Sequence, residues 1–145
     1  MRYSQYKFNF YLNASHAIYI NGAMGQSHPH TWEIIIKVIK SSDKFVMFNE
    51  VEKKIEEFLD GYQNSFLNDF QPFDTLNPTL ENITGYFLEK FQTLLEELGW
   101  TIFYIEVGET PTRSYIISRV ENNIVSNLRH SNIVEDIIDT AFEGE

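Results

Sequence analysis

Residues 8–38 read FNFYLNASHAIYINGAMGQSHPHTWEIIIKV and contain three of the four histidines of the chain. From Phe8 to Ala14 every second residue is apolar, which predicts a strand with His16 on the same apolar face. His28 and His30 open a second alternating run, and residues two apart in a strand share a face. If the two runs form a hairpin, the three imidazoles converge on its inner face.

Three histidine nitrogens with a fourth position left to water are the catalytic zinc arrangement, with Zn–N bonds of about 2.0–2.1 Å. A His-x-His pair alone is weak evidence, because a surface strand can carry two histidines without binding metal. The third histidine on a neighbouring run strengthens the metal interpretation. The chain has no cysteine, which excludes a cysteine-type zinc site and favours an open site that carries water. The alternative is that the histidines are ordinary polar groups of the core.

The composition limits the class of protein. A chain of 145 residues is typical of one domain, and its 43% hydrophobic content is sufficient for a core. We expect no membrane span, because no run of about 18 apolar residues occurs, and no secretory signal is evident near the start. A cytoplasmic location is therefore expected. The net charge of −10 argues against nucleic acid as a partner, since phosphate contacts need lysine and arginine.

Between residues 49 and 99 the apolar spacing changes to that of helices. A first amphipathic helix is predicted from Asn49, with this apolar stripe: Val51, Ile55, Phe58, Leu59, Tyr62 and Phe66. Residues 68–78 contain two prolines and are expected to form a loop. Thr79 is predicted to cap a second helix that ends near Gly99, with this stripe: Ile83, Phe87, Phe91, Leu94, Leu95 and Leu98.

Two further strands are predicted at residues 100–107 and 114–120, the first with Phe103, Ile105 and Val107 on the face that Glu109 continues. The order strand, strand, helix, helix, strand, strand predicts an α+β fold in which a four-stranded antiparallel sheet carries both helices on one face. We expect one domain over residues 1–120. The C-terminal extension, residues 121–145, ends in an apolar pattern that predicts a helix, and its His130 is not expected to be a ligand.

Four motifs resemble those of the 6-pyruvoyltetrahydropterin synthase and 6-carboxytetrahydropterin synthase family in order and spacing. They are NASH at residues 13–16, HPH at 28–30, PTLEN at 78–82 and VGET at 107–110. The similarity runs from about Phe8 to Arg119. It implies the T-fold, or tunnelling fold, in which ββααββ subunits join edge to edge into barrels. It also implies a homo-oligomer, either a trimer or a hexamer built from two trimers.

The resemblance implies roles for individual residues. His16, His28 and His30 would bind Zn²⁺. Glu109 would anchor a pterin ring, because a carboxylate can accept two parallel hydrogen bonds from the 2-amino group and a ring N–H. Thr79 and Glu81 would line the same ring pocket.

Simpler interpretations of the two carboxylates remain open. Glu109 could be an exposed acid at a turn that follows a strand. Glu81 could be present only because the helix dipole favours an acidic residue in the first turn of a helix.

The chain departs from this family at its proton relay. Family members have a cysteine four residues before the His-x-His pair and an Asp-His pair on the first helix. Met24, Gln63 and Asn64 occupy these positions, and none of these side chains titrates near neutral pH. A second alignment, on Leu59-Asp60, places Gly61 at the histidine position, so the histidine is absent either way.

Two smaller departures accompany the loss of the relay. Pro29 replaces the glycine between the paired histidines, and Met47 stands where an acidic residue usually precedes the first helix. The three histidines and the glutamate to which the resemblance gives the roles of zinc ligands and ring anchor are nevertheless present.

Two hypotheses for the function follow. The first is a zinc-dependent lyase that acts on dihydroneopterin triphosphate or a related pterin. It would need another base, such as a zinc-bound hydroxide, Tyr62 or a residue of a neighbouring subunit. The second is a catalytically silent or differently active homologue that binds zinc and a pterin or purine.

Overall fold

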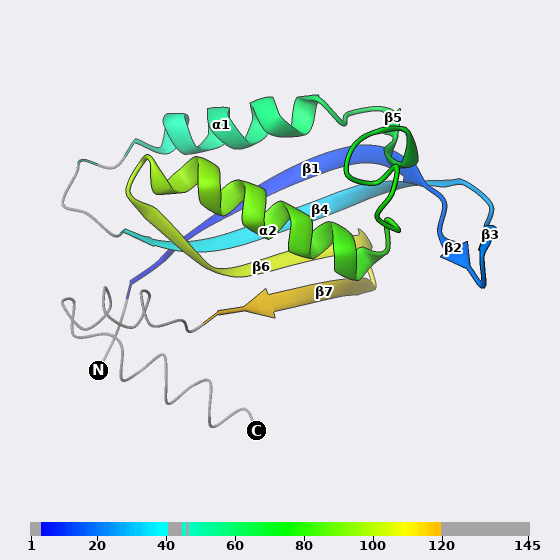
Figure 1. Ribbon diagram of the computed structural model, residues 1–145. Helices are drawn as coiled ribbons and strands as arrows, with labels where there is room; N and C mark the ends of the chain where they lie inside the picture. Colours follow the sequence, from blue (N-terminus) through cyan, green and yellow to red (C-terminus); the bar gives the residue numbers. More distant parts are fainter. Residues whose placement is uncertain (1–3, 41–44, 46, 120–145) are drawn as a thin grey trace, which may run out of the picture.

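The computed structural model describes residues 4–40, 45 and 47–119, and both helices of this part cover one face of a sheet (Figure 1). The strand order in the sheet is β5-β1-β4-β6-β7. Its strands are β1 (Tyr6–His16), β4 (His28–Lys40), β5 (Ser65–Phe66), β6 (Trp100–Thr110) and β7 (Arg113–Ser118). The four long strands are antiparallel to their neighbours, which confirms the predicted α+β fold. The two-residue strand β5, which pairs parallel with β1, was not among the four predicted strands.

The register between β1 and β4 explains the alternation in the sequence. Leu12 lies opposite Trp32, and Phe10 lies opposite Ile34, so their side chains share the face that the helices cover. These four side chains are buried. Burial of each large apolar side chain contributes about 1.5–3 kcal/mol to folding, so a shift of one residue in register would be strongly unfavourable. This register also sets which histidines meet at the end of the hairpin.

Helix α1 (Phe48–Asp60) is shorter than the sequence indicates. It buries Val51, Ile55 and Leu59, as predicted, but Tyr62 lies in the turn that follows and Phe66 lies on β5, so the prediction that they continue the helix was wrong. The chain leaves the helix because the Asn64 N–H donates to the Asn13 carbonyl of β1 at 2.6 Å, and Asn64 adopts a left-handed conformation with φ of 58°.

Helix α2 (Leu80–Glu96) begins directly after Thr79, as predicted, but it ends at Glu96, so Leu98 of the predicted stripe lies in the turn that follows. The Thr79 hydroxyl accepts a hydrogen bond from the Asn82 backbone N–H at 3.2 Å, which is a normal N-cap. Gly99 has a φ of 82°, a conformation that glycine adopts without strain, and the chain turns there into β6.

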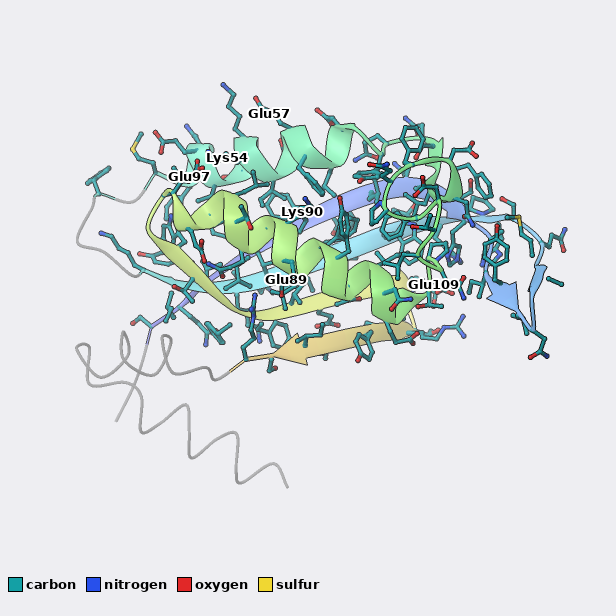
Figure 2. All side chains as sticks on the ribbon, in the orientation of Figure 1. Lys54, Glu57, Glu89, Lys90, Glu97 and Glu109 are labelled. Carbon is teal, nitrogen blue, oxygen red and sulfur yellow. The ribbon has the colours of Figure 1, made fainter. Side chains whose placement is uncertain are left out.

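Strand β6 departs from simple alternation. The pairing shifts between Lys37 and Val38 of β4, where Tyr104 and Ile102 are the successive partners and Phe103 is left over. This bulge places both Ile102 and Ile105 in the core, while Phe103 is only half-buried. The prediction that Phe103 shares the inner face of Ile105 was therefore wrong. Beyond the bulge, β6 continues to Thr110, and Figure 2 shows Glu109 at the end of the sheet opposite the Lys54–Glu97 ion pair.

The connection between the two histidine-bearing strands is itself a small hairpin. Strand β1 ends at His16, and the chain pairs again as β2 (Tyr19–Ile20) and β3 (Ala23–Met24). Asn21 and Gly22 both have positive φ at its tip, as a type I′ turn requires.

Two expectations concern other parts of the chain. Within residues 4–40, 45 and 47–119, no helix has the length and apolarity needed to cross a membrane. The predicted C-terminal helix and His130 lie outside the described residues.

Candidate metal centre

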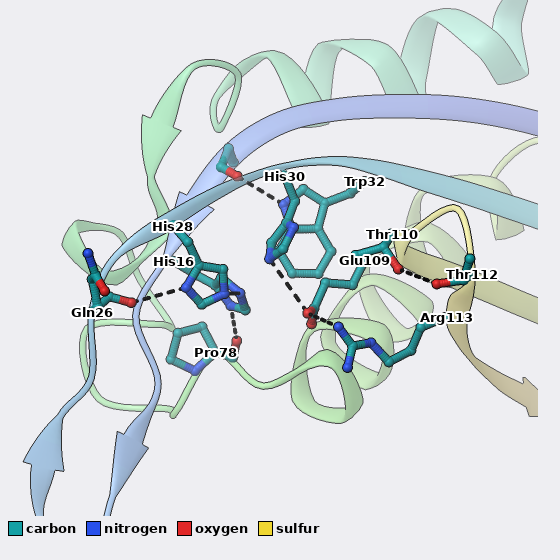
Figure 3. Close-up of polar contacts among 11 residues, drawn as sticks. His16, Gln26, His28, His30, Trp32, Pro78, Glu109, Thr110, Thr112 and Arg113 are labelled. Carbon is teal, nitrogen blue, oxygen red and sulfur yellow. Dashed lines mark hydrogen bonds and ion pairs between the residues drawn. The ribbon is translucent and has the colours of Figure 1, made fainter.

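Three histidines and one glutamate come together where β1 and β6 end and β4 begins. One potential ligand atom from each of His16, His28, His30 and Glu109 lies within 4.8 Å of the others (Figure 3). The pairing of β1 with β4 places His16 opposite His28, and His30 is two residues farther along β4. His16 is fully buried, whereas the other three side chains are half-buried, so the group is open to solvent on one side.

Backbone carbonyls determine which ring nitrogen carries the proton in two of these histidines. His16 Nδ1 lies 2.8 Å from the Pro78 carbonyl oxygen, and His28 Nδ1 lies 3.0 Å from the Gln26 carbonyl oxygen. Since a carbonyl oxygen can only accept, each Nδ1 must be the donor. In the neutral rings, both Nε2 atoms therefore carry a lone pair.

These two lone pairs face each other, because His16 Nε2 and His28 Nε2 are only 2.9 Å apart. Two acceptors at that distance repel unless a proton or a cation lies between them. In the described part of the chain, His30 Nε2 is buried without a hydrogen-bond partner and lies 3.5 Å from Glu109 Oε1. Three imidazole nitrogens without suitable partners, aimed at one place, fit a cation such as Zn²⁺.

Trp32 forms an apolar wall beside the histidine rings. Its ring packs edge-on against the rings of His16 and His30, with centroid distances of 4.9 and 5.1 Å. Its Nε1–H donates to the Ala14 carbonyl at 3.1 Å, so the indole is held in place at full burial. A rigid apolar wall limits the number of ring orientations that the histidines can adopt.

Burial also favours the neutral form of His16 and His30. Desolvation lowers the pKa of His16 and of His30 below the ordinary value, and the opposing effect of the Glu109 carboxylate is smaller in both cases. Neutral imidazole is the form that binds metal.

We therefore expect His16 and His30 of the metal-free protein to titrate below pH 6.5, the ordinary histidine value. The unfolded chain binds protons first as the pH falls, so these two groups reduce the stability of the metal-free protein below about pH 6.5 and not above it. The measurement is an NMR titration of the histidine ring signals. A midpoint at or above 6.5 for either residue would contradict the expectation.

Glu109 lies beside the histidines, with a side chain only 12% exposed. Its Oε1 is 3.5 Å from His30 Nε2 and 3.5 Å from Arg113 Nη2. Glu109 and His30 also line a cavity of about 630 Å³, within the usual size range of small-molecule sites. Sequence reasoning treated Glu109 only as a ring anchor and missed that its carboxylate can also reach a metal. Its place on the inner face of the predicted strand was the available signal.

The other two proposed ring-pocket residues, Thr79 and Glu81, do not belong to the group of potential metal ligands. Thr79 follows Pro78, the residue that holds His16, and its hydroxyl is engaged in the helix cap. Glu81 is exposed in the first turn of α2. The residues that line the cavity beside Glu109 include neither of them.

The relay positions are spread over three local environments. Met24 is exposed on β3. Gln63 binds the backbone of β1 through its amide. Asn64 lines a cavity of about 460 Å³ together with His30. Met47 precedes α1 as its N-cap residue, without a side-chain hydrogen bond to the helix.

Tyr62, the alternative base, is a core residue. Its hydroxyl lies 2.9 Å from the Gln71 carbonyl oxygen and 3.1 Å from the Tyr86 hydroxyl. Burial, and then the contact with Tyr86, raises the pKa of Tyr62 well above its usual range. Tyr62 is therefore a neutral phenol near pH 7 and not a base.

Comparisons with known proteins give a family and a fold for the chain. The family model described as 6-pyruvoyl tetrahydropterin synthase matches residues 5–120. The 6-pyruvoyl tetrahydropterin synthase of Caenorhabditis elegans superimposes with a TM-score of 0.66 at 17% identity, covering 81% of this chain and 96% of that one. The enzyme of Plasmodium falciparum gives 0.59 at 17% identity, covering 82% and 100%. An uncharacterised protein from Wolinella succinogenes gives 0.62 at 14% identity, covering 81% and 98%.

No curated protein matches the chain in a sequence comparison. At identities below one fifth, the similar structures show the fold, which is the T-fold that the motifs implied.

Proposed function

Because the chain belongs to the 6-pyruvoyl tetrahydropterin synthase family, we propose that it is a zinc-dependent lyase that acts on dihydroneopterin triphosphate or a related pterin. His16, His28 and His30 would hold the metal. The observation that carries the proposal is the 2.9 Å approach of two Nε2 atoms whose rings already donate from Nδ1. Ordinary polar core histidines would instead direct a donor at an acceptor.

In this proposal the metal, Glu109 and Trp32 each have a separate role. Bound zinc would act as a Lewis acid that polarises oxygen atoms of the pterin side chain. Glu109 would orient the ring through two parallel hydrogen bonds to its carboxylate. Trp32 would keep water from the buried side of the histidine rings, which strengthens the electrostatic interactions there.

A second candidate is a homologue that binds zinc and a pterin or purine without the usual turnover. The Gln63 amide favours it, because the side chain at this relay position is committed to two backbone hydrogen bonds of β1. Met24 and Asn64 cannot supply a proton either. Under the first candidate, the base would have to come from elsewhere, for example from a neighbouring subunit.

Association of subunits is part of the proposal. β7 is one edge of the sheet, and the first residues of β1 precede the region that β5 covers at the other edge. Pairing between such edges would join copies of the chain into a closed barrel, as a trimer or a hexamer.

The test is the metal content of protein purified without added metal, followed by assays with dihydroneopterin triphosphate. We expect about one zinc per chain. Release of triphosphate with formation of a new pterin product would support the lyase. Zinc and saturable pterin binding without any product would overturn the lyase and support the second candidate. A protein that takes up no zinc, even after reconstitution, would overturn both.

A further inference from the structure

Three side-chain amides from residues 63–77 bind the edge of β1 that faces away from β4, and the chain just after β1. Each amide offers an N–H donor and a carbonyl acceptor side by side, as a neighbouring strand would. Gln63 makes the first of these contacts. Its Oε1 accepts from the Asn13 N–H at 2.9 Å, and its Nε2 donates to the Tyr11 carbonyl at 2.9 Å.

The other two amides lie on the far side of His16. The buried side chain of Asn68 accepts from the Ala17 N–H at 3.0 Å and donates to the Ala17 carbonyl at 2.8 Å. Asn77 repeats the pattern on Tyr19, with distances of 2.9 and 3.0 Å. Together with the pairing of β5, these contacts cover the edge from Tyr11 to Tyr19.

This arrangement ties one particular loop to the chain on both sides of His16. The residue after Asn77 is Pro78, whose carbonyl receives the His16 Nδ1–H at 2.8 Å (Figure 3). Asn68 binds the residue directly after His16. The amides therefore set where the Pro78 carbonyl stands relative to the imidazole.

We propose that Asn68 and Asn77 are positioning residues of the metal centre, which hold His16 as the Nδ1–H tautomer with Nε2 aimed at the metal. The proposal rests on the proposed metal site. A metal-bound histidine is normally oriented by a partner of its other nitrogen, and loss of such a partner typically lowers metal affinity 10–100-fold. Here that partner is a backbone carbonyl, so the residues that place the loop take over this role.

Gln63 belongs to the same set but lies farther from the imidazole. Its two hydrogen bonds reach the strand at Tyr11 and Asn13, before His16. The first of the two alignments with the family places part of the proton relay at this position, whereas in this chain Gln63 attaches the loop to the strand.

The chain offers a matched control. Gln92 of α2 accepts from the Ile102 N–H at 2.8 Å and donates to the Trp100 carbonyl at 3.4 Å. This is the same kind of contact, made at the start of β6, whereas Glu109 lies near the end of that strand. Gln92→Ala removes one amide of this kind without touching the loop.

The experiment compares Asn68→Ala, Asn77→Ala and Gln92→Ala in the full chain. Cobalt(II) is the metal probe, because its visible absorption reports ligand geometry. We expect the two asparagine variants to bind cobalt at least about 10-fold more weakly, with a changed spectrum. We expect Gln92→Ala to bind cobalt like the parent protein, although its midpoint of urea unfolding falls.

A second readout needs no metal. Long-range ¹H–¹⁵N NMR of the metal-free protein reports which His16 nitrogen carries the proton. We expect the Nδ1–H form in the parent protein and in Gln92→Ala, and a mixture of tautomers in Asn68→Ala and Asn77→Ala. Asn77→Asp keeps the acceptor for the Tyr19 N–H. We expect it to have a larger fraction of the Nδ1–H tautomer of His16 than Asn77→Ala has. If Asn68→Ala does not fold, the Asn77 variants still decide.

The outcomes separate this inference from the proposed function. A parent protein that binds no cobalt would overturn the metal site, while the tautomer measurement would still test the positioning role. Unchanged cobalt affinity and an unchanged His16 tautomer in both asparagine variants would overturn the positioning role, even in a protein that binds metal.

Discussion

Replacement of His28 by alanine is expected to lower zinc affinity by about a thousand-fold and to leave a purified protein with almost no zinc. Zinc held by protein ligands is bound with roughly 10–16 kcal/mol, and loss of one of three histidines removes about a third of it. His28 is half-buried at the start of β4, so the change opens no cavity in the core. The measurement is zinc per chain after dialysis, together with a competition titration.

His130→Ala is the control for this variant, because His130 is the one histidine outside the proposed ligand set. We expect it to keep the zinc content of the parent protein. Equal zinc content in His28→Ala and the parent would remove His28 from the ligand set. It would also contradict the interpretation that the Nε2 atoms of His16 and His28 bind a cation together.

Replacement of Glu109 by glutamine is expected to weaken binding of a pterin by about 100-fold in the zinc-loaded protein. Glutamine presents an amide N–H₂ where the carboxylate presents a second acceptor, so one of two charge-assisted hydrogen bonds is lost and a donor faces a donor. Hydrogen bonds to charged groups contribute about 1.5–3 kcal/mol each, which supports a change of this size. The measurement is fluorescence titration with a dihydropterin at saturating zinc.

Glu106→Gln is the matched control. Glu106 lines the same cavity, but its carboxylate already accepts hydrogen bonds from Tyr104 at 2.7 Å and Ser114 at 2.9 Å. We expect this variant to bind pterin with nearly unchanged affinity. Zinc affinity must be measured as well, because Glu109 Oε1 lies near the histidine nitrogens. Weaker zinc binding in Glu109→Gln with normal pterin binding would make Glu109 a metal ligand rather than a ring anchor.

Local patterns predicted most of the fold. The alternation from Phe8 to His16 and the run after His30 specified two strands and their buried faces, because side chains alternate between the two faces of any strand. The Thr79 cap was also predictable, since it depends on residues three positions apart. The end of α1 was not, because Tyr62 and Phe66 keep helical spacing while Asn64 binds Asn13, far away in the sequence.

The bulge in β6 was not predictable from the sequence either, because it too depends on residues that are distant in the sequence. Nothing in the residues near Phe103 indicates that Ile102 and Ile105 both face the core. That arrangement depends on how β6 pairs with Val38 and Lys37 of β4.

At the candidate site, the sequence by itself determined which residues share a face: His16 on one strand, His28 and His30 on the next, and Glu109 on a third. Only the tertiary structure decided what their atoms do. The Pro78 carbonyl selects the tautomer of His16 across 62 positions of sequence, and Glu109 reaches His30 Nε2 through the pairing of β4 with β6. The physical reason is that strand periodicity is a local property of the backbone. The direction of a hydrogen bond depends instead on a partner that only folding brings near.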